Sequence, residues 1–250
     1  MDDLKTQWVK QAEDINQACI GLLNDASRIY TVKTMLASKS LALMLMSRSL
    51  GNFKGAFVLL DNRLMTEARV LIRCCFENAF WMVRLLAEGE DFAKRMQDDE
   101  LYNREALGKL ALEKHKGLDE AVEQGLRRRS RDLKGKLPKD AKLYPQKVAQ
   151  GSLLDIAYAL YCQLSADAAH PSLTALNRHL GRRVSDAKVV IGIVPEPKED
   201  EVVQTLDWAC HAQLAVYAGL TEILTGTTDD TRLHELTRRQ ITLSGVHKTE

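Results

Sequence analysis

The sequence has few cysteines for its length, and this shortage excludes two common ways of building a small scaffold. Five cysteines occur among 250 residues. Cys74 and Cys75 are adjacent, and no pair has the C-x-x-C spacing. A disulfide framework and a thiolate zinc site are therefore not predicted, and a reducing compartment, the cytoplasm, is expected.

Long hydrophobic runs are also missing. The richest apolar stretch, residues 36–60, is interrupted by Lys39, Arg48 and Lys54. Because an ionised side chain inside hydrocarbon is costly, no membrane span is predicted. The first residues, MDDLKTQW, contain no apolar segment, so no secretory signal is predicted either.

Motifs for several enzyme classes are absent. The chain contains no glycine-rich phosphate loop, no G-x-S-x-G and no zinc-ligand spacing. Nucleotide triphosphatase and serine hydrolase functions are therefore not predicted, and no cofactor or metal is expected.

Charge is balanced overall but unevenly distributed. The formal net charge is +1, yet residues 127–147 form a basic block in which acidic residues are few. Such a block is either a solvated loop or, if its charges gather on one face, a surface for RNA. Its basic residues are Arg127, Arg128, Arg129, Arg131, Lys134, Lys136, Lys139, Lys142 and Lys147.

Apolar residues recur at three- and four-residue spacing along most of the chain, which predicts amphipathic helices. The predicted helices cover about residues 3–28, 32–60 with a kink near 51–55, 66–89 with Thr66 as N-cap, 91–131, 152–170 with Ser152 as N-cap, and 200–224. Val189 to Val194 is the single β-like run. We predict an all-α fold, an antiparallel bundle of about six or seven helices with at most a minor β-hairpin.

The same pattern predicts the domain organisation. Residues 1–226 are expected to form one helical-bundle domain that includes a basic loop at about 132–151, where prolines and lysines replace the periodic pattern. Residues 227–250 are expected to be a polar, peripheral tail.

The helix predicted at 66–89 contains four charged residues, Arg69, Arg73, Glu77 and Arg84, on neighbouring ridges of an otherwise apolar segment. Charges in that position need partners, because an unpaired buried charge is strongly destabilising. Two interpretations remain open. Arg73 and Glu77, four residues apart, could be a structural ion pair that fixes helix register, or the set could line a polar pocket inside the bundle.

A second constellation lies at residues 165–172, Ser-Ala-Asp-Ala-Ala-His-Pro-Ser. Pro171 holds His170 extended, and a loop position keeps its imidazole accessible to solvent. Such a histidine could act in catalysis, or it could cap a helix or bond a buried carbonyl. Asp167 and His170 could also ligate a metal, although a single D-x-x-H is a weak metal signal in a bundle.

The pattern LLDNRLMTEARVLIRCCFENAFWMVRLL, followed about ninety residues later by LSADAAHPSL, resembles an uncharacterised family of bacterial helical proteins classed as a domain of unknown function. The shared features are Arg-x-x-x-Glu (Arg73, Glu77) and a later element with Ser165, His170 and Ser172. The resemblance covers about residues 36–224 and implies an all-α bundle without an established activity.

That family is in turn similar, in outline, to the small bundles that include HEPN ribonucleases of toxin–antitoxin and phage-defence systems. Those nucleases have an arginine followed by four to six residues and a histidine, a spacing that this chain lacks. RNA cleavage would therefore require Arg73 and His170 to meet from separate helices. Histidine would move the 2′-hydroxyl proton, and arginine would stabilise the charged phosphate.

Three hypotheses about function follow. The first is an RNA-directed, ribonuclease-like effector of bacterial defence or toxin systems, with Arg73, Glu77 and His170 as catalytic residues. The second is a non-catalytic helical module that binds a cognate bacterial protein or a small ligand and forms a homodimer. The third uses Asp167, His170 and Glu77 as metal ligands. Residues expected to bind a ligand or RNA are Arg69, Arg84, Ser165, Ser172, Arg127, Arg128 and Arg129.

Overall fold

A computed structural model gives the fold of the chain. The structure describes residues 2–26, 34–115, 117–133, 135–185, 188–192 and 197–247. Its helices are α1 (Asp2–Ala26), α2 (Ser38–Asp61), α3 (Met65–Glu88), α4 (Glu90–Lys114), α5 (Glu120–Leu133), α6 (Pro145–Ala149), α7 (Tyr158–Leu164), α8 (Leu173–Asn177), α9 (Glu199–Thr225) and α10 (Thr231–His247). A 3-10 turn, η3 (Asp155–Ala157), precedes α7, and a π-helical turn, η4 (Ser165–Ala169), follows it.

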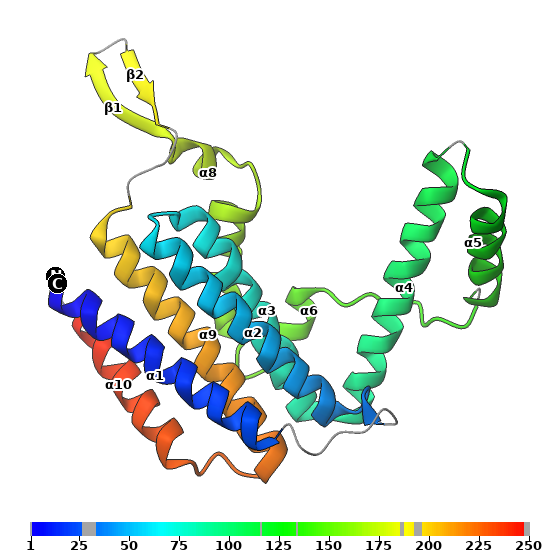
Figure 1. The fold of residues 1–250 in the computed structure, drawn as a ribbon, viewed down its shortest axis with the longest axis horizontal. Helices are drawn as coiled ribbons and strands as arrows, with labels where there is room; N and C mark the ends of the chain where they lie inside the picture. Colours follow the sequence, from blue (N-terminus) through cyan, green and yellow to red (C-terminus); the bar gives the residue numbers. More distant parts are fainter. Residues whose placement is uncertain are drawn as a thin grey trace.

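Two strands complete the fold, β1 (Leu180–Ser185) and β2 (Lys188–Ile191). They pair antiparallel, with Leu180 opposite Ile191, and form a hairpin that projects beyond α8 (Figure 1). The prediction of an all-α bundle with at most a minor hairpin is confirmed for the described residues.

The core lies between α1, α2, α3 and α9, and α3 packs against both α2 and α9. Fully buried aromatic side chains come from three of these helices, Trp8 of α1, Phe53 of α2, and Phe76 and Phe80 of α3. Burial of a large apolar side chain contributes about 1.5–3 kcal/mol. The wide apolar face predicted for the helix at 66–89 therefore places that helix at the centre of the bundle.

Close packing of α9 on α3 depends on Gly219. A Cβ atom at this position would lie 2.6 Å from Cγ of Met82, a separation that real side chains do not tolerate. A glycine in the middle of a helix costs about 1 kcal/mol of helix propensity, and here it allows the two helices to approach.

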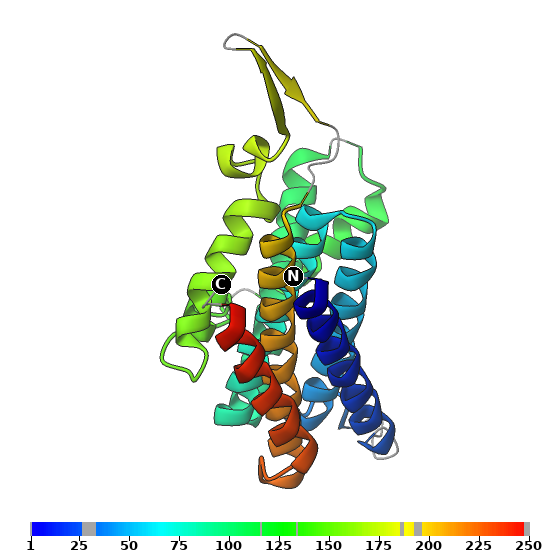
Figure 2. The same ribbon diagram turned by 90° about the vertical axis from the view of Figure 1, so that its left-hand side faces the viewer.

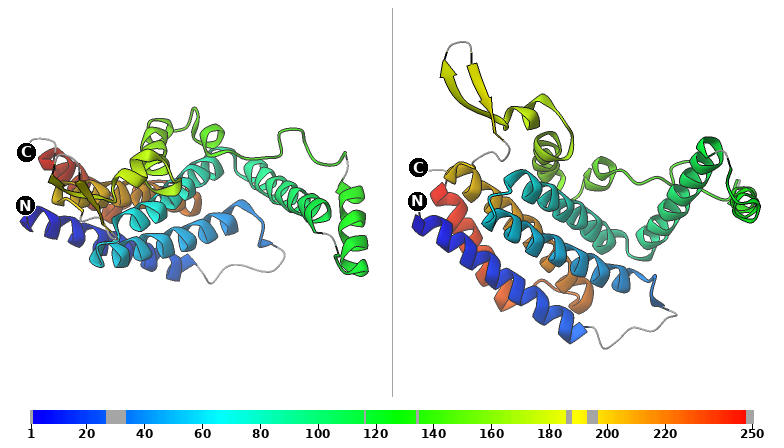
Figure 3. Two further views of the ribbon diagram at one scale, coloured as in Figure 1. Left: turned by 90° about the horizontal axis from the view of Figure 1, so that it is seen from above. Right: turned by 45° about the horizontal axis from the view of Figure 1, so that its top comes forward.

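Helices α4 and α5 pack on each other and project from the bundle as an arm, here called the α4–α5 arm (Figures 1 and 3). Only Phe92 and Ala93 of α4 are buried, and α5 has no buried residue. The single helix predicted at 91–131 is therefore wrong, because the chain turns between Lys114 and Glu120. Gly117 has φ of +97° in that turn, a conformation that glycine adopts without strain.

The prediction that residues 227–250 form a peripheral tail is also wrong. Residues 231–247 form α10, which packs against α1 and α9. Leu233, Leu236 and Leu243 are buried, and the Gln11 side-chain amide of α1 donates to the Leu236 carbonyl oxygen at 2.8 Å. Because α10 is polar on average, its composition predicted a peripheral tail, although its buried leucines form a short apolar stripe.

Two predicted N-caps are also wrong. Helix α3 begins at Met65, and Leu64 at its N-cap position makes no side-chain cap. Ser152 accepts a hydrogen bond from the Leu154 amide at 3.1 Å, but the turn η3 intervenes before α7 begins at Tyr158. Helix α2 runs through residues 51–55 unbroken. The predicted segments at Val32 and at 193–194 lie outside the described residues.

The basic loop predicted at about 132–151 contains the short helix α6. It returns from the tip of the arm to the bundle, and the Leu143 amide donates to Oδ1 of Asp99 on α4 at 2.8 Å. Within the described ranges, every helix is too short or too polar to cross a membrane.

Candidate functional site

Charged side chains of α3 meet two other parts of the chain, the α7–η4 segment and α9. Arg69 is 4% exposed. Its Nε donates to Oγ1 of Thr205 on α9 at 3.0 Å, and its Nη1 forms an ion pair with Asp167 of η4. Its Cζ lies 5.4 Å from the Trp208 ring centroid. Arg69 therefore ties α3 to two segments that lie about one hundred or more residues away in sequence.

Asp167 is the centre of this buried ion pair. Its Oδ2 also accepts from Nη2 of Arg178 at 2.8 Å, and Arg178 reaches Oε1 of Glu201 at 3.1 Å. Burial alone raises the pKa of Asp167, but the hydrogen bonds and charges of Arg178 and Arg69 outweigh it and hold the pKa below its ordinary value. Asp167 is therefore ionised at neutral pH.

One helical turn after Arg69, Arg73 is held by three neighbours. Its Nε donates to Oγ of Ser165 at 2.8 Å, and its Nη2 donates to the Tyr161 hydroxyl and pairs with Oε1 of Glu77 at 3.1 Å. The Tyr161 hydroxyl donates to the same Glu77 oxygen at 2.9 Å. We call Arg73, Glu77, Tyr161 and Ser165 the Arg73 cluster.

The electrostatics of the Arg73 cluster keep Tyr161 protonated. Burial and the adjacent Glu77 carboxylate raise the pKa of Tyr161 to about 12. The Tyr161 ring stacks on the Tyr158 ring, with the two centroids 5.5 Å apart. Cζ of Arg73 lies 4.6 Å from the centroid of the Tyr161 ring. The cluster is partly accessible, since the side chains of Arg73 and Glu77 are 21% and 25% exposed.

Arg84, about three turns after Arg73 along α3, contacts the chain segment that returns from the arm. Its Nε donates to the Val148 carbonyl oxygen at 2.6 Å and its Nη2 to that of Gln150. Its Nη1 pairs with Glu88 at 3.2 Å. Arg84 therefore links α3 to α6 and to the residue that follows α6.

His170 and Ser172 lie where η4 ends. His170 is exposed, and its imidazole forms no hydrogen bond or ion pair with any described residue. The Ser172 hydroxyl accepts from the Ala175 amide at 3.1 Å and donates to the Ala166 carbonyl oxygen. Ser172 is therefore the N-cap of α8.

The structure thus brings together part of the predicted site. Arg73, Glu77 and Ser165 meet through hydrogen bonds, whereas no hydrogen bond or ion pair in the described part of the chain joins His170 to Arg73 or Glu77. Sequence reasoning missed Tyr161 and Arg178. Tyr161 fits an apolar helical stripe, and Arg178 lies in a polar stretch, so neither stood out.

The metal interpretation has no geometric support. Among the described residues, no three His, Cys, Asp or Glu side chains gather as they would around an ion. Asp167, one of the three proposed ligands, is engaged by two arginines.

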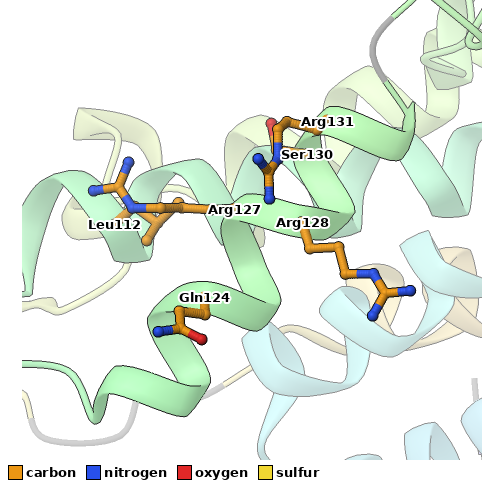
Figure 4. Close-up of a pocket in the computed structure, with 6 residues that line it drawn as sticks. All are labelled: Leu112, Gln124, Arg127, Arg128, Ser130 and Arg131. Carbon is orange, nitrogen blue, oxygen red and sulfur yellow. The ribbon is translucent and has the colours of Figure 1, made fainter.

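The remaining predicted binding residues lie far from α3, on the α4–α5 arm. Arg127 donates from Nε to Oε1 of Glu123 at 2.8 Å. Arg128, Arg129 and Arg131 are exposed and form no hydrogen bond or ion pair within the described ranges. Arg127, Arg128 and Arg131 line a shallow hollow at the surface of α5, where the guanidinium groups of Arg127 and Arg128 point in different directions (Figure 4).

A family model described as a family of unknown function, DUF5677, matches residues 39–188, more than half of the chain. The matched range contains α3, the α4–α5 arm, the Arg73 cluster and His170. No curated protein and no solved structure matches the chain.

Proposed function

This chain belongs to the DUF5677 family of unknown function, and since that membership assigns no activity, we propose that the protein binds single-stranded RNA through the basic surface of its α4–α5 arm. The observation that supports the proposal is a contrast between two groups of arginines. Arg69, Arg73 and Arg84 in the bundle are engaged by protein acceptors. Arg128 and Arg129 on the arm are exposed and engage no described residue.

Unpaired arginines on a projecting helix suit a polyanion. A guanidinium group can bind a phosphate with two parallel hydrogen bonds, and each phosphate neutralised releases counterions into solution. The chain as a whole has a formal net charge of +1, and acidic residues balance the basic ones along α4. The attraction that we propose therefore comes from the arginines at the end of α5 and the lysines of the loop that follows it.

The exposed ring of Tyr144 favours single-stranded RNA over a duplex as the ligand. It lies on the basic loop and is 46% exposed. The ammonium groups of Lys142 and Lys147 lie 5.0 Å and 5.8 Å from its ring centroid. If these lysine side chains move from the ring to neighbouring phosphates, the exposed ring offers an unpaired base a stacking surface worth about 1–3 kcal/mol.

The test is RNA binding measured by fluorescence anisotropy over a series of salt concentrations. The test variant replaces three unpaired arginines, Arg128→Gln, Arg129→Gln and Arg131→Gln. The matched control replaces three cations of the same arm that already have i,i+4 carboxylate partners, Lys94→Gln, Arg104→Gln and Lys109→Gln.

The test variant should bind a single-stranded RNA of about 20 nucleotides at least tenfold more weakly, a loss of about 1.4 kcal/mol. Its plot of log K against log salt should be flatter by about 2 units, since each phosphate contact contributes about 0.7 for a single strand. The control should resemble the wild type in affinity. Equal losses in both variants, or no binding by the wild type, would refute the proposal.

A catalytic form of this proposal requires Arg73, Glu77 and His170 to act together on bound RNA. No hydrogen bond or ion pair in the described part of the chain joins His170 to Arg73 or Glu77, whose contacts are with Ser165, Tyr161 and each other, so the binding form has the better geometric support. An RNA cleavage assay on the wild type, His170→Ala and Arg73→Ala tests it. Cleavage by the wild type that both substitutions abolish would establish a ribonuclease, whereas equal background in all three would leave binding alone.

A specific observation favours a second candidate, a non-catalytic module that binds a partner protein. Large apolar side chains are exposed along residues 153–191, from the turn before α7 to the hairpin. They are Leu153, Ile156, Leu173, Leu176, Leu180 and Ile191. Exposed apolar side chains of this number, if they gather on one face, would suit a protein interface. Loss of partner or ligand binding in Leu173→Asp, with RNA affinity unchanged, would favour this candidate.

A further inference from the structure

The β1–β2 hairpin is a basic ribbon that projects from the bundle. Its strand residues include Arg182, Arg183 and Lys188 and no carboxylate, so the two strands have a formal charge of +3. The whole chain has a formal charge of only +1. In the antiparallel register, Arg183 lies opposite Val189 and Lys188 lies opposite Ser185. Both strands therefore contribute cations to the ribbon.

Protein packing leaves the ribbon largely uncovered. In the described part of the chain, β1 and β2 pair with each other, and neither packs extensively on a helix. Leu180 and Ile191, which lie opposite each other at the base, are 55% and 76% exposed. A two-stranded hairpin by itself is only marginally stable in water. A basic ribbon of this kind suits an anionic chain that binds along it.

The hairpin and the α4–α5 arm are both attached to α3. Near the start of α3, Arg69 pairs with Asp167, which also pairs with Arg178, two residues before β1. Near the end of α3, Arg84 donates to two carbonyl oxygens of the chain that returns from the arm. Arg69 and Arg84 are 15 residues apart in one helix, which corresponds to about 22 Å. A single helix therefore fixes the separation of the two attachments.

The two basic segments flank one surface. Figure 1 shows the hairpin and the arm projecting upward at opposite ends of the bundle, and the chain connects them through α6, α7, η4 and α8. His170 is exposed on this connection, and the side chains of Arg73 and Glu77 are partly accessible beside it. A strand that contacted both projections would pass over this part of the molecule.

We propose that the β1–β2 hairpin is a second RNA-binding element, so that one single strand extends from the α4–α5 arm across α7 and η4 to the hairpin. The inference rests on the RNA binding proposed above for the arm. Once the arm holds a strand, the hairpin meets the rest of it at a high effective concentration, provided that the strand is long enough. At about 3.4 Å per nucleotide in a stacked strand, the separation of about 22 Å alone takes about seven nucleotides.

The test compares short and long RNA in fluorescence anisotropy, with probes of about 6 and about 30 nucleotides. The hairpin variant is Arg182→Gln with Arg183→Gln. It leaves Arg178 intact, and circular dichroism and a melting curve check that the bundle is unchanged. The control removes two exposed cations elsewhere, Lys10→Gln on α1 and Lys54→Gln on α2. Figure 2 shows α1 on the opposite side of α9 from α7, away from the proposed path.

The hairpin variant should bind the long RNA at least fivefold more weakly than the wild type does. Its plot of log K against log salt should be flatter by about 1.4 units, because two phosphate contacts are lost at about 0.7 each. Both proteins should bind the short RNA equally, because that probe reaches only the arm. The control should match the wild type with both probes.

Three outcomes would overturn the inference and leave RNA binding by the arm in place. The hairpin variant could bind the long RNA as the wild type does, while the variant with Arg128, Arg129 and Arg131 replaced binds it weakly. The control could lose as much affinity as the hairpin variant. The hairpin variant could also lose equal affinity for both probes, which would exclude a strand that spans the two elements. A wild type that binds neither probe would refute the proposed function and this inference together.

Duplex DNA is the alternative ligand that the experiment must separate. A two-stranded ribbon fits the major groove of B-DNA, so a DNA duplex of about 30 base pairs is measured beside the long RNA. Tighter binding of the duplex, weakened in the hairpin variant, would overturn the assignment to single-stranded RNA and give the hairpin to duplex DNA. Weaker binding of the duplex, unaffected by the hairpin substitutions, is the expected result.

Discussion

Replacing the buried Asp167 by asparagine should cause a large loss of stability. Asp167 is 6% exposed and accepts hydrogen bonds from Arg69 and Arg178. The side-chain amide of the substituted asparagine would place N–H donors against guanidinium donors and leave the charge of Arg69 buried without its counterion. Removing one partner of a buried ion pair costs about 3–5 kcal/mol, far more than the net value of the pair itself.

A matched control comes from the outer side of the same network. Glu201 also pairs with Arg178, at 3.1 Å, but its side chain is 28% exposed. Glu201→Gln removes the same charge where water can replace it, so the expected loss is at most about 1 kcal/mol. For a chain of this size, a loss of about 1 kcal/mol lowers the melting temperature by about 2–4 °C. Asp167→Asn should therefore lower it by roughly 6–20 °C, and Glu201→Gln by only a few degrees.

The pH dependence gives a second readout. The folded-state pKa of Asp167 lies below its ordinary value of 3.8. A lowered pKa contributes stability that is present above the unfolded value and is lost as the pH falls toward the folded value. The difference in unfolding free energy between wild type and Asp167→Asn should therefore be constant near neutral pH and shrink below about pH 4.

Urea denaturation followed by circular dichroism, at about pH 7 and at several acidic pH values, measures these differences. A loss below about 1 kcal/mol for Asp167→Asn would refute the reasoning, because it would mean that Arg69 finds another acceptor or water. A gap that widened on acidification would contradict the assigned sign of the pKa shift.

Two further predictions concern the Arg73 cluster and the packing of α9. Glu77→Gln should lower the pKa of Tyr161 from about 12 toward its ordinary value, which tyrosinate absorbance detects. The raised pKa stabilises the wild type, and this stability is lost as the pH rises through about 12; in Glu77→Gln it should be lost at lower pH. An unchanged titration would be inconsistent with the Glu77 contact. Gly219→Ala should destabilise by about 1–3 kcal/mol because its Cβ would meet Cγ of Met82 at 2.6 Å. Gly55→Ala, whose Cβ would meet only the tip of a leucine side chain at 2.9 Å, should cost less in the same melting scan.

The sequence by itself determined the fold class. Apolar residues at three- and four-residue spacing specify where a helix presents its buried face, and this information lies within about a dozen residues of chain. The central position of α3 was predictable in the same way, because its apolar face is too wide for a surface helix. The charges of Arg69 and Arg73 on that helix also predicted, correctly, that other parts of the chain meet them.

Helix ends and minor helices were less well determined. The turn at Gly117 interrupts a charged, weakly periodic segment in which propensity alone favours one helix. The leucine stripe of α10 is narrow, and its burial depends on packing against both α1 and α9. Tertiary packing decided both outcomes.

Only the tertiary structure decided which groups became partners. Ser165 and Asp167 reach α3 from positions 92 and 98 residues distant along the chain, and no local pattern encodes such a pairing. Tyr161 occupies an apolar stripe, so its hydroxyl is invisible to periodicity, yet it completes the hydrogen bonding of Arg73 and Glu77. Local spacing fixes which face of a helix is buried, whereas the identity of its polar contacts depends on how several helices pack at once.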